Sequence, residues 1–159
     1  MNTVAGATGT VRASSLRLLV VEDDPADVAL IENAIAAQNL PTDLHVVSDG
    51  EEAMAFLHRR GVHADAPRPD LIMLDLNMPR VDGREVLTAV KADNQLKPIP
   101  VVVFTTSTVD VDVLASYSAH ANAYVTKPLD LHTFERVVSD IHRFYSTIAS
   151  LPPGLPDRE

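Results

Sequence analysis

The chain has no cysteine and no long apolar run, and both absences exclude classes of protein. Without cysteine there is no disulfide framework, no thiolate nucleophile and no cysteine-ligated zinc site. The apolar runs reach about five residues, far short of the roughly 20 that a membrane-spanning helix needs. Residues 1–15 lack a basic segment followed by an apolar one, so no signal peptide is predicted. These absences predict a cytoplasmic protein with no membrane partner.

Positive charge and glycine are also scarce. The 159 residues contain 13 lysines and arginines against 22 aspartates and glutamates, which gives a formal net charge of −9. Nucleic-acid binding depends on a basic surface that neutralises phosphates, so no nucleic-acid partner is expected. The six glycines form no glycine-rich loop after a strand, which argues against a flavin-binding or dinucleotide-binding module. The acid excess is compatible with a site for a divalent cation.

What the sequence does contain is a regular alternation of apolar segments of strand length with segments of helical period. A chain that alternates in this way folds into a parallel sheet with helices on both faces, joined by right-handed crossovers. With 46% apolar residues, the chain can fill one core, so we predict a single α/β domain with a doubly wound five-stranded sheet. The expected strands are residues 17–21, 44–48, 70–75, 99–106 and 122–126.

The two ends of the chain depart from this alternation. Residues 1–15 are small and polar and are predicted to be a flexible leader, which leaves 16–148 as the domain. The apolar stripe of the last helix continues through Phe144 and Ile148, and residues 149–159 follow as a proline-rich tail. The stripe either ends the helix without a partner or packs on a second subunit. An exposed apolar strip usually marks an interaction surface, so we favour a homodimer through this helix and tail.

Polar side chains stand where four of the predicted strands end. Glu22 and Asp23 follow the first strand, Asp75 ends the third, Thr105 the fourth and Lys127 the fifth. Taken singly, each has an ordinary explanation as a helix cap, a strand residue or a solvated lysine. In doubly wound sheets, however, ligands bind outside the carboxyl ends of the strands. Mg²⁺ prefers hard oxygen ligands, and two of these aspartates can supply them.

These residues resemble the receiver domain of two-component response regulators. The resemblance rests on VVEDD at 20–24, LDLNMPRVDG at 74–83, Thr105 and YVTKP at 124–128, in this order and each at a strand tip. It extends over about residues 16–145 and implies the flavodoxin-like strand order 2-1-3-4-5. It also implies that the chain accepts a phosphoryl group from a partner histidine kinase. Such a domain catalyses only its own phosphorylation and dephosphorylation, so it is not expected to be an enzyme with other substrates.

The resemblance assigns an acceptor and a metal site to this chain. Asp75 takes the position of the phosphoacceptor. The implied Mg²⁺ site consists of Glu22, Asp23, Asp75 and the backbone carbonyl of Asn77, with Asp23 as a direct ligand. One departure from the family pattern is Glu22, because aspartate is commoner at that position. The resemblance therefore implies that Glu22 acts on the metal through water.

The resemblance also implies how the domain would switch. Lys127 is the charge partner of the phosphorylated aspartate, and Thr105 is the switch hydroxyl. Tyr124 is the aromatic residue that follows Thr105 on activation. The expected result is a reshaped face made by the fourth helix (109–117), the fifth strand and the last helix.

Other segments resemble a narrower group, the stand-alone response regulators that pair with bacterial phytochromes. These segments are EDDPAD at 22–27, FLHRRGVHADAPRPD at 56–70 and LKPIPVVVFTTS at 96–107. Members of this group are single receivers without an output domain. The implied partner is therefore a sensor histidine kinase of the bacteriophytochrome type.

Two alternatives share parts of this pattern. A phosphohydrolase of the haloacid-dehalogenase type also uses an aspartate at a strand tip, but it places a second acid two residues later, where this chain has Asn77. A receiver-like interaction module that works without phosphorylation would need none of the polar tips. The complete set of acids, threonine and lysine argues against that second alternative.

Overall fold

The structure is a computed structural model that describes residues 15–78 and 80–153. Its sheet has five parallel strands in the order β2-β1-β3-β4-β5, which confirms the predicted topology. Residues 1–14 of the predicted leader and 154–159 of the predicted tail lie outside the described residues. The strands are β1 (Leu16–Val21), β2 (Thr42–Val47), β3 (Leu71–Leu74), β4 (Val101–Thr105) and β5 (Ala123–Thr126).

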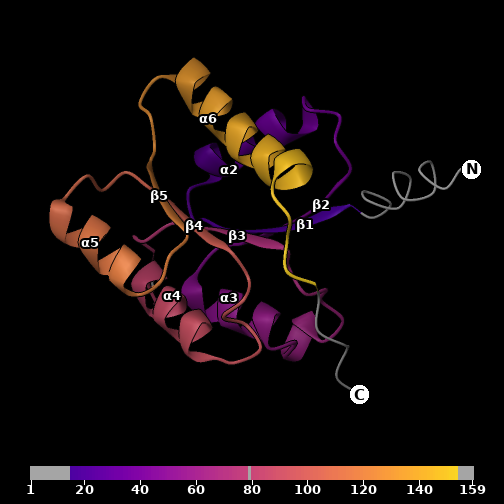
Figure 1. Ribbon diagram of the computed structural model, residues 1–159, viewed down its shortest axis with the longest axis vertical. Coiled ribbons are helices and arrows are strands. Elements are labelled where there is room, and N and C mark those ends of the chain that lie inside the picture. The colour runs from indigo at the N-terminus through magenta and orange to yellow at the C-terminus, as the bar shows by residue number, and fades with distance from the viewer. Residues whose placement is uncertain (1–14, 79, 154–159) are drawn as a thin grey trace, which may run out of the picture.

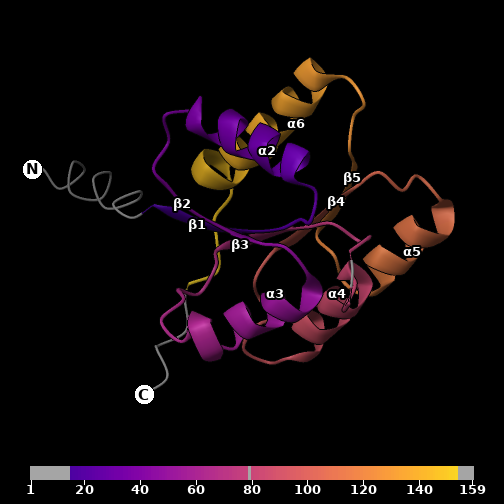
Figure 2. The same ribbon diagram turned by 180° about the vertical axis from the view of Figure 1, so that it is seen from behind.

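Helices cover both faces of this sheet, as Figures 1 and 2 show. Helices α2 (Pro25–Ala36) and α6 (Leu131–Arg143) lie on one face. Helices α3 (Gly50–Leu57), α4 (Gly83–Ala92) and α5 (Asp110–Ser118) lie on the other. None of the helices in the described ranges has the length and apolar character needed to cross a bilayer.

The core is split into two layers by the sheet. Along β1, Leu19 and Val21 pack with the α3 and α4 side, whereas Leu18 and Val20 pack with the α2 and α6 side. Every residue of β3 and β4 is buried, because both are central strands covered on both faces. This double burial explains why the strands read as continuous apolar runs in the sequence.

Aspartate side chains fix where four of these helices begin. Asp24, Asp49, Asp82 and Asp130 each accept a hydrogen bond from a backbone N–H in the first turn of the helix that follows. An N-cap of this kind satisfies a donor that the helix itself leaves unpaired. Helix α5 differs, because Val109 stands at its N-cap and offers no side-chain hydrogen bond.

The end of α3 is fixed by its backbone. The helix stops at Leu57, because Arg59 adopts a left-handed φ of 54°. The Arg60 N–H then donates to the Ala55 carbonyl at 2.8 Å, and a short 3₁₀ turn occupies Gly61–His63.

The last helix does not keep a regular α-helical period to its end. A π-helical turn at Phe144–Ile148 changes the helical period, so Phe144 and Ile148 are exposed while the polar residue Ser146 is buried. Leu131, at the start of the stripe, is exposed as well. His142 is fully buried, and its Nε2 lies 2.7 Å from the Thr42 hydroxyl of β2.

A candidate phosphoryl-acceptor pocket at the strand tips

Glu22 lies at the bottom of the pocket, immediately after β1. Its backbone N–H donates to the Val47 carbonyl at 3.0 Å, which continues the strand pairing past β1. The side chain is almost fully buried, and its carboxylate accepts hydrogen bonds from the Lys127 ammonium and from the Asp24 N–H. Burial raises the pKa of Glu22 to about 7, although both hydrogen bonds and the charge of Lys127 oppose this rise.

Lys127 reaches the same pocket from the end of β5. Its backbone N–H donates to the Thr105 carbonyl at 2.7 Å, so the residue is still held by the sheet. The buried ammonium contacts Glu22, lies 2.8 Å from Asp27 Oδ2 and 3.7 Å from Asp75 Oδ2. Burial by itself lowers the pKa of Lys127, but the hydrogen bonds and charges of these carboxylates outweigh it and raise the pKa. Lys127 is therefore held as a cation.

Asp75 is set rigidly at the tip of β3. Its N–H donates to the Val21 carbonyl at 3.0 Å, and the residue is buried apart from a small part of its side chain. Gly83 passes so close that a Cβ there would lie 1.9 Å from the Asp75 carbonyl oxygen. Only glycine permits this approach of α4, which closes one side of the pocket. The Asn77 N–H lies 3.4 Å from Asp75 Oδ1, so the chain folds back over the carboxylate.

Glu22, Asp23 and Asp75 form a group of oxygen donors that fits a divalent cation. One carboxylate oxygen from each residue lies within 4.8 Å of the other two. Glu22 and Asp75 are buried, whereas Asp23 is exposed, so the group opens to solvent on the Asp23 side. Three acids this close repel one another, and a hard cation relieves that repulsion. This acidic pocket is the metal site that the sequence predicts for these three residues.

Thr105 ends β4 beside this group. It is fully buried, and its hydroxyl has no hydrogen-bond partner among the described residues. A buried hydroxyl without a partner is costly, so it marks a position where an acceptor can bind. The sheet brings Thr105 next to Lys127, as the register of β4 and β5 shows by pairing Thr105 with Thr126.

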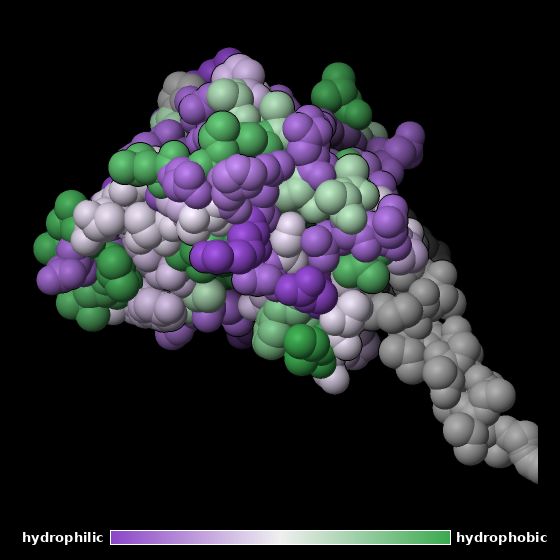
Figure 3. All heavy atoms as spheres, turned by 90° about the horizontal axis from the view of Figure 1, so that it is seen from above, coloured by the Kyte–Doolittle hydropathy of each residue, from purple (hydrophilic) through white to green (hydrophobic). Residues whose placement is uncertain are grey.

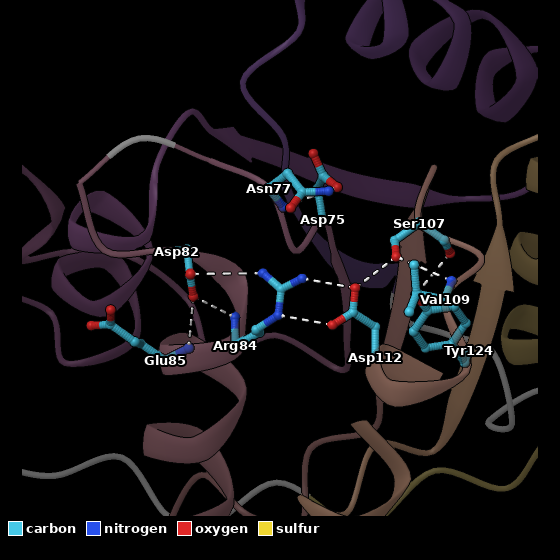
Figure 4. Close-up of polar contacts among 9 residues, drawn as sticks. All are labelled: Asp75, Asn77, Asp82, Arg84, Glu85, Ser107, Val109, Asp112 and Tyr124. Carbon is cyan, nitrogen blue, oxygen red and sulfur yellow. Dashed lines mark hydrogen bonds and ion pairs between the residues drawn. The ribbon is translucent and has the colours of Figure 1, made fainter. Parts of the chain in front are cut away.

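Tyr124 belongs to a polar network on the other side of the β4 tip (Figure 4). Its hydroxyl donates to the Ser107 carbonyl at 2.8 Å, two residues beyond Thr105. The Ser107 hydroxyl donates to Asp112 at 2.6 Å, and Arg84 donates to the same carboxylate at 2.9 Å. These hydrogen bonds from Ser107 and Arg84 lower the pKa of Asp112. The network therefore connects the start of α4, the start of α5 and β5.

Comparison with known proteins identifies the family. Residues 18–139 match the response regulator receiver domain. The chain is a response regulator receiver.

Solved structures and curated relatives agree with this assignment. Response regulator Rcp1 of Synechocystis sp. is 44% identical to the receiver over 135 residues, which cover 85% of this chain and 92% of Rcp1. The phosphorylated cyanobacterial phytochrome response regulator RcpA superimposes with a TM-score of 0.85 at 45% identity, over 88% of this chain and all of RcpA. The Mn²⁺-bound form of Rcp1 gives a TM-score of 0.83 at 43% identity, over 86% and 99% of the two chains.

The family assignment decides between the predicted functions at a coarse level. A receiver is a signalling domain and not an ordinary enzyme, and receivers of phytochrome systems pair with histidine kinases. The phosphohydrolase and phosphorylation-independent alternatives are not favoured by these relatives. The predicted site residues come together in the receiver as the strand-tip argument requires, with Glu22, Asp23, Asp75 and Lys127 in one pocket.

Several residues near this pocket were missed by the sequence analysis. Asp27 contacts Lys127, although its position in the first turn of α2 suggests only an ordinary acid near a helix N-terminus. Ser107, Arg84 and Asp112 form the network around the β4 tip, and the partners Arg84 and Asp112 are 28 residues apart in the sequence. No local pattern marks such pairs, because they depend on how α4 and α5 lie side by side.

Proposed function

We propose that this receiver accepts a phosphoryl group on Asp75 from the phosphohistidine of a partner kinase. The observation that supports this most directly is the convergence on Asp75 of two further carboxylates and a buried ammonium 3.7 Å away. A lone strand-end aspartate would not need this surrounding. The buried hydroxyl of Thr105, which has no partner among the described residues, adds a donor for a phosphoryl oxygen.

The reaction is a direct transfer between two nucleophiles. An Asp75 carboxylate oxygen attacks the phosphorus, the new O–P bond forms, and the P–N bond to the histidine breaks. The electron pair of that bond stays on the imidazole nitrogen. This nitrogen takes up a proton from solvent, so the kinase histidine is left as a neutral imidazole. The receiver contributes placement and charge neutralisation, which are the main sources of catalysis in phosphoryl transfer.

The metal is inferred to be Mg²⁺, held by Asp23, Asp75 and the Asn77 backbone carbonyl, with Glu22 acting through water. The carboxylate group described above supports a hard divalent cation, and the Mn²⁺-bound form of the relative Rcp1 supports a metal in this class of pocket. A bound Mg²⁺ would neutralise phosphoryl oxygens that otherwise meet three carboxylates. Lys127 supplies the remaining positive charge.

The signal would leave through Thr105 and Tyr124. A phosphoryl oxygen on Asp75 gives the Thr105 hydroxyl an acceptor and draws it inward. Tyr124, whose hydroxyl is tied to the Ser107 carbonyl, then repacks, and the face formed by α5, β5 and α6 changes shape. We expect Thr105→Ala to be phosphorylated but to lose most of the amide chemical-shift changes on this face. Shift changes as large as those of the wild type in phosphorylated Thr105→Ala would contradict the switch.

We infer that the kinase is a bacteriophytochrome, because the relatives RcpA and Rcp1 are similar over nearly the whole described chain and RcpA is named as a phytochrome response regulator. The receiver would then be cytoplasmic, with residues 16–148 as the domain, residues 1–15 as a flexible leader and residues 149–159 as a proline-rich tail. The excess of acid over base supports the absence of a nucleic-acid partner.

The homodimer is inferred from the C-terminal helix. Phe144 and Ile148 expose apolar side chains just before the tail. We expect a dimeric mass by light scattering at micromolar concentration, and Ile148→Asp to weaken it. A monomeric mass for both the free and the phosphorylated protein would contradict this interface.

The decisive experiment is phospho-labelling of wild-type and Asp75→Asn receivers with a candidate phytochrome kinase and labelled ATP. Asp75→Asn should carry no label, because the amide is not a nucleophile. Excess chelator, added to the purified phosphorylated kinase before the receiver, should abolish transfer to the wild type, since the three carboxylates then repel the incoming phosphate. Normal labelling of Asp75→Asn would refute the acceptor assignment, and retained transfer in chelator would refute the metal requirement.

A further inference from the structure

The Lys127 ammonium is closer to Asp27 than to the proposed acceptor. Lys127 Nζ lies 2.8 Å from Asp27 Oδ2 and 3.7 Å from Asp75 Oδ2. The first distance is that of a charge-assisted hydrogen bond, and the second is too long for one. In this state the lysine is therefore bound by Glu22 and Asp27 and only faces Asp75.

Asp27 has an ordinary role that must be weighed first. An acid in the first turn of a helix stabilises it through the helix dipole, wherever its side chain points. Here the side chain points into the pocket, where it is only 21% exposed and meets an ammonium that is 5% exposed. The dipole does not require this contact, which joins residues 100 apart in the sequence.

The donors of Lys127 are limited. An ammonium has three N–H groups, and Glu22 and Asp27 each take one. Asp27 is carried by α2, whose start is fixed by the Asp24 cap, so its carboxylate cannot follow the lysine far. The third N–H is left for the side of Asp75, whose Oδ2 lies 3.7 Å away. A phosphoryl group on Asp75 therefore has to attract an ammonium that Glu22 and Asp27 already hold at shorter distances.

We propose that Asp27 is a positioning residue that holds Lys127 on the α2 side of the pocket and competes with the phosphoryl group on Asp75 for this cation. The proposal rests on the proposed function of Asp75. Asp27 thus weakens the attraction between Lys127 and a phosphoryl group on Asp75. It thereby sets how readily the receiver stays in its phosphorylated conformation.

The test is the affinity of the pocket for beryllium trifluoride, a phosphoryl mimic that coordinates a carboxylate oxygen, measured by calorimetry at saturating Mg²⁺. Asp27→Asn keeps the shape of the side chain and removes its charge. We expect it to bind the mimic roughly three- to tenfold more tightly than the wild type, the range of an ordinary hydrogen bond, because the asparagine still accepts from Lys127 and only the charge is lost. Asp27→Ser should show the same direction.

Two further variants separate positioning from a general charge effect or from helix stability. Asp27→Glu restores the charge and should return the affinity toward the wild-type value. Glu32→Gln removes one negative charge from an exposed position of the same helix and should leave the affinity unchanged. High salt screens a distant charge effect but not a buried contact, so the gain in Asp27→Asn should persist there.

The outcomes are distinct. Unchanged or weaker binding by Asp27→Asn and Asp27→Ser, in a wild-type background that binds the mimic, would overturn the competition. An equal gain in Glu32→Gln would also overturn it, because a general charge effect would then suffice. Failure of the wild type itself to bind the mimic would instead count against the proposed function of Asp75.

Discussion

Helices α4 and α5 cover the same sheet face, but they are attached to it in different ways. Helix α4 starts at an aspartate cap and buries an apolar side along its whole length. Helix α5 has no side-chain cap among the described residues, and its only buried residue is Ser116. Figure 3 shows apolar side chains gathered on the surface at the α5 end of the molecule. The large apolar residues exposed there are Val109, Val111, Leu114 and Tyr117.

The polar network of Figure 4 replaces the missing apolar attachment of α5. Arg84 at the start of α4 contacts Asp112, which also binds Ser107 in the loop before α5. Apolar packing is lost when a helix moves, whereas surface hydrogen bonds can be exchanged for water at small net cost. From this difference we expect α4 to keep the pocket in place and α5 to be the helix that moves.

The largest expected effect is the difference in unfolding free energy between two leucine truncations, one on α4 and one on α5. Leu87→Ala on α4 should lower the free energy of unfolding by about 2–5 kcal/mol, because it opens a cavity in the core. Leu114→Ala on α5 removes the same atoms from an exposed site and should change it by less than about 0.5 kcal/mol. Urea denaturation of both variants measures the contrast, and similar losses would contradict it.

A fall in pH should weaken the contact of α6 with β2 before it weakens the polar contacts of α5. Burial lowers the pKa of His142, so the folded state favours the neutral ring that pairs with Thr42. The unfolded chain then binds the proton first, and the contribution of His142 to stability is lost as the pH falls below about 6.5, by at most about 1.4 kcal/mol per pH unit. The pKa of Asp112 is instead lowered from 3.8, so its contacts persist until the pH falls below that value.

The measurement is the free energy of unfolding in a series of buffers from about pH 8 to about pH 5, the range in which histidine titrates. His142→Gln should make the protein more stable toward low pH relative to the wild type, because it leaves only the opposite contribution of Glu22, whose pKa is raised from 4.5 to about 7 in the folded state. His58→Gln, at an exposed position, should leave the wild-type slope unchanged. A wild-type slope in His142→Gln would show that another group carries the dependence.

The smallest effect is expected from opening the Arg84–Asp112 contact. Arg84→Gln and Asp112→Asn should each let α5 and the Ser107 loop move more easily, and so bind beryllium trifluoride about two- to fivefold more tightly. Arg143→Gln, which breaks the exposed pair with Asp140 on α6, is the matched control and should have no effect. Unchanged or weaker binding in the first two variants would mean that the network does not restrain the switch.

Strands and strand-tip residues could be predicted from the sequence, whereas the different attachments of α4 and α5 could not. The alternation of segments predicted five strands, and the observed β4 (Val101–Thr105) lies inside the predicted 99–106. The pocket was predictable because parallel strands end at one edge, so side chains at their tips must meet. The π-helical turn and the burial of His142 in the last helix were not predictable, because packing against the rest of the fold decides them.

The strands, the family and the polar residues at the strand tips could be predicted, because they depend on local period and on residue type. The carboxylates that share the Lys127 ammonium and the polar contacts that hold α5 became known from the fold alone. Both depend on distances between segments up to 105 residues apart. Asp27 illustrates the difference. Its sequence position suggests an ordinary acid at a helix N-terminus, whereas its contact with Lys127 lets it compete with the phosphoryl group for this ammonium.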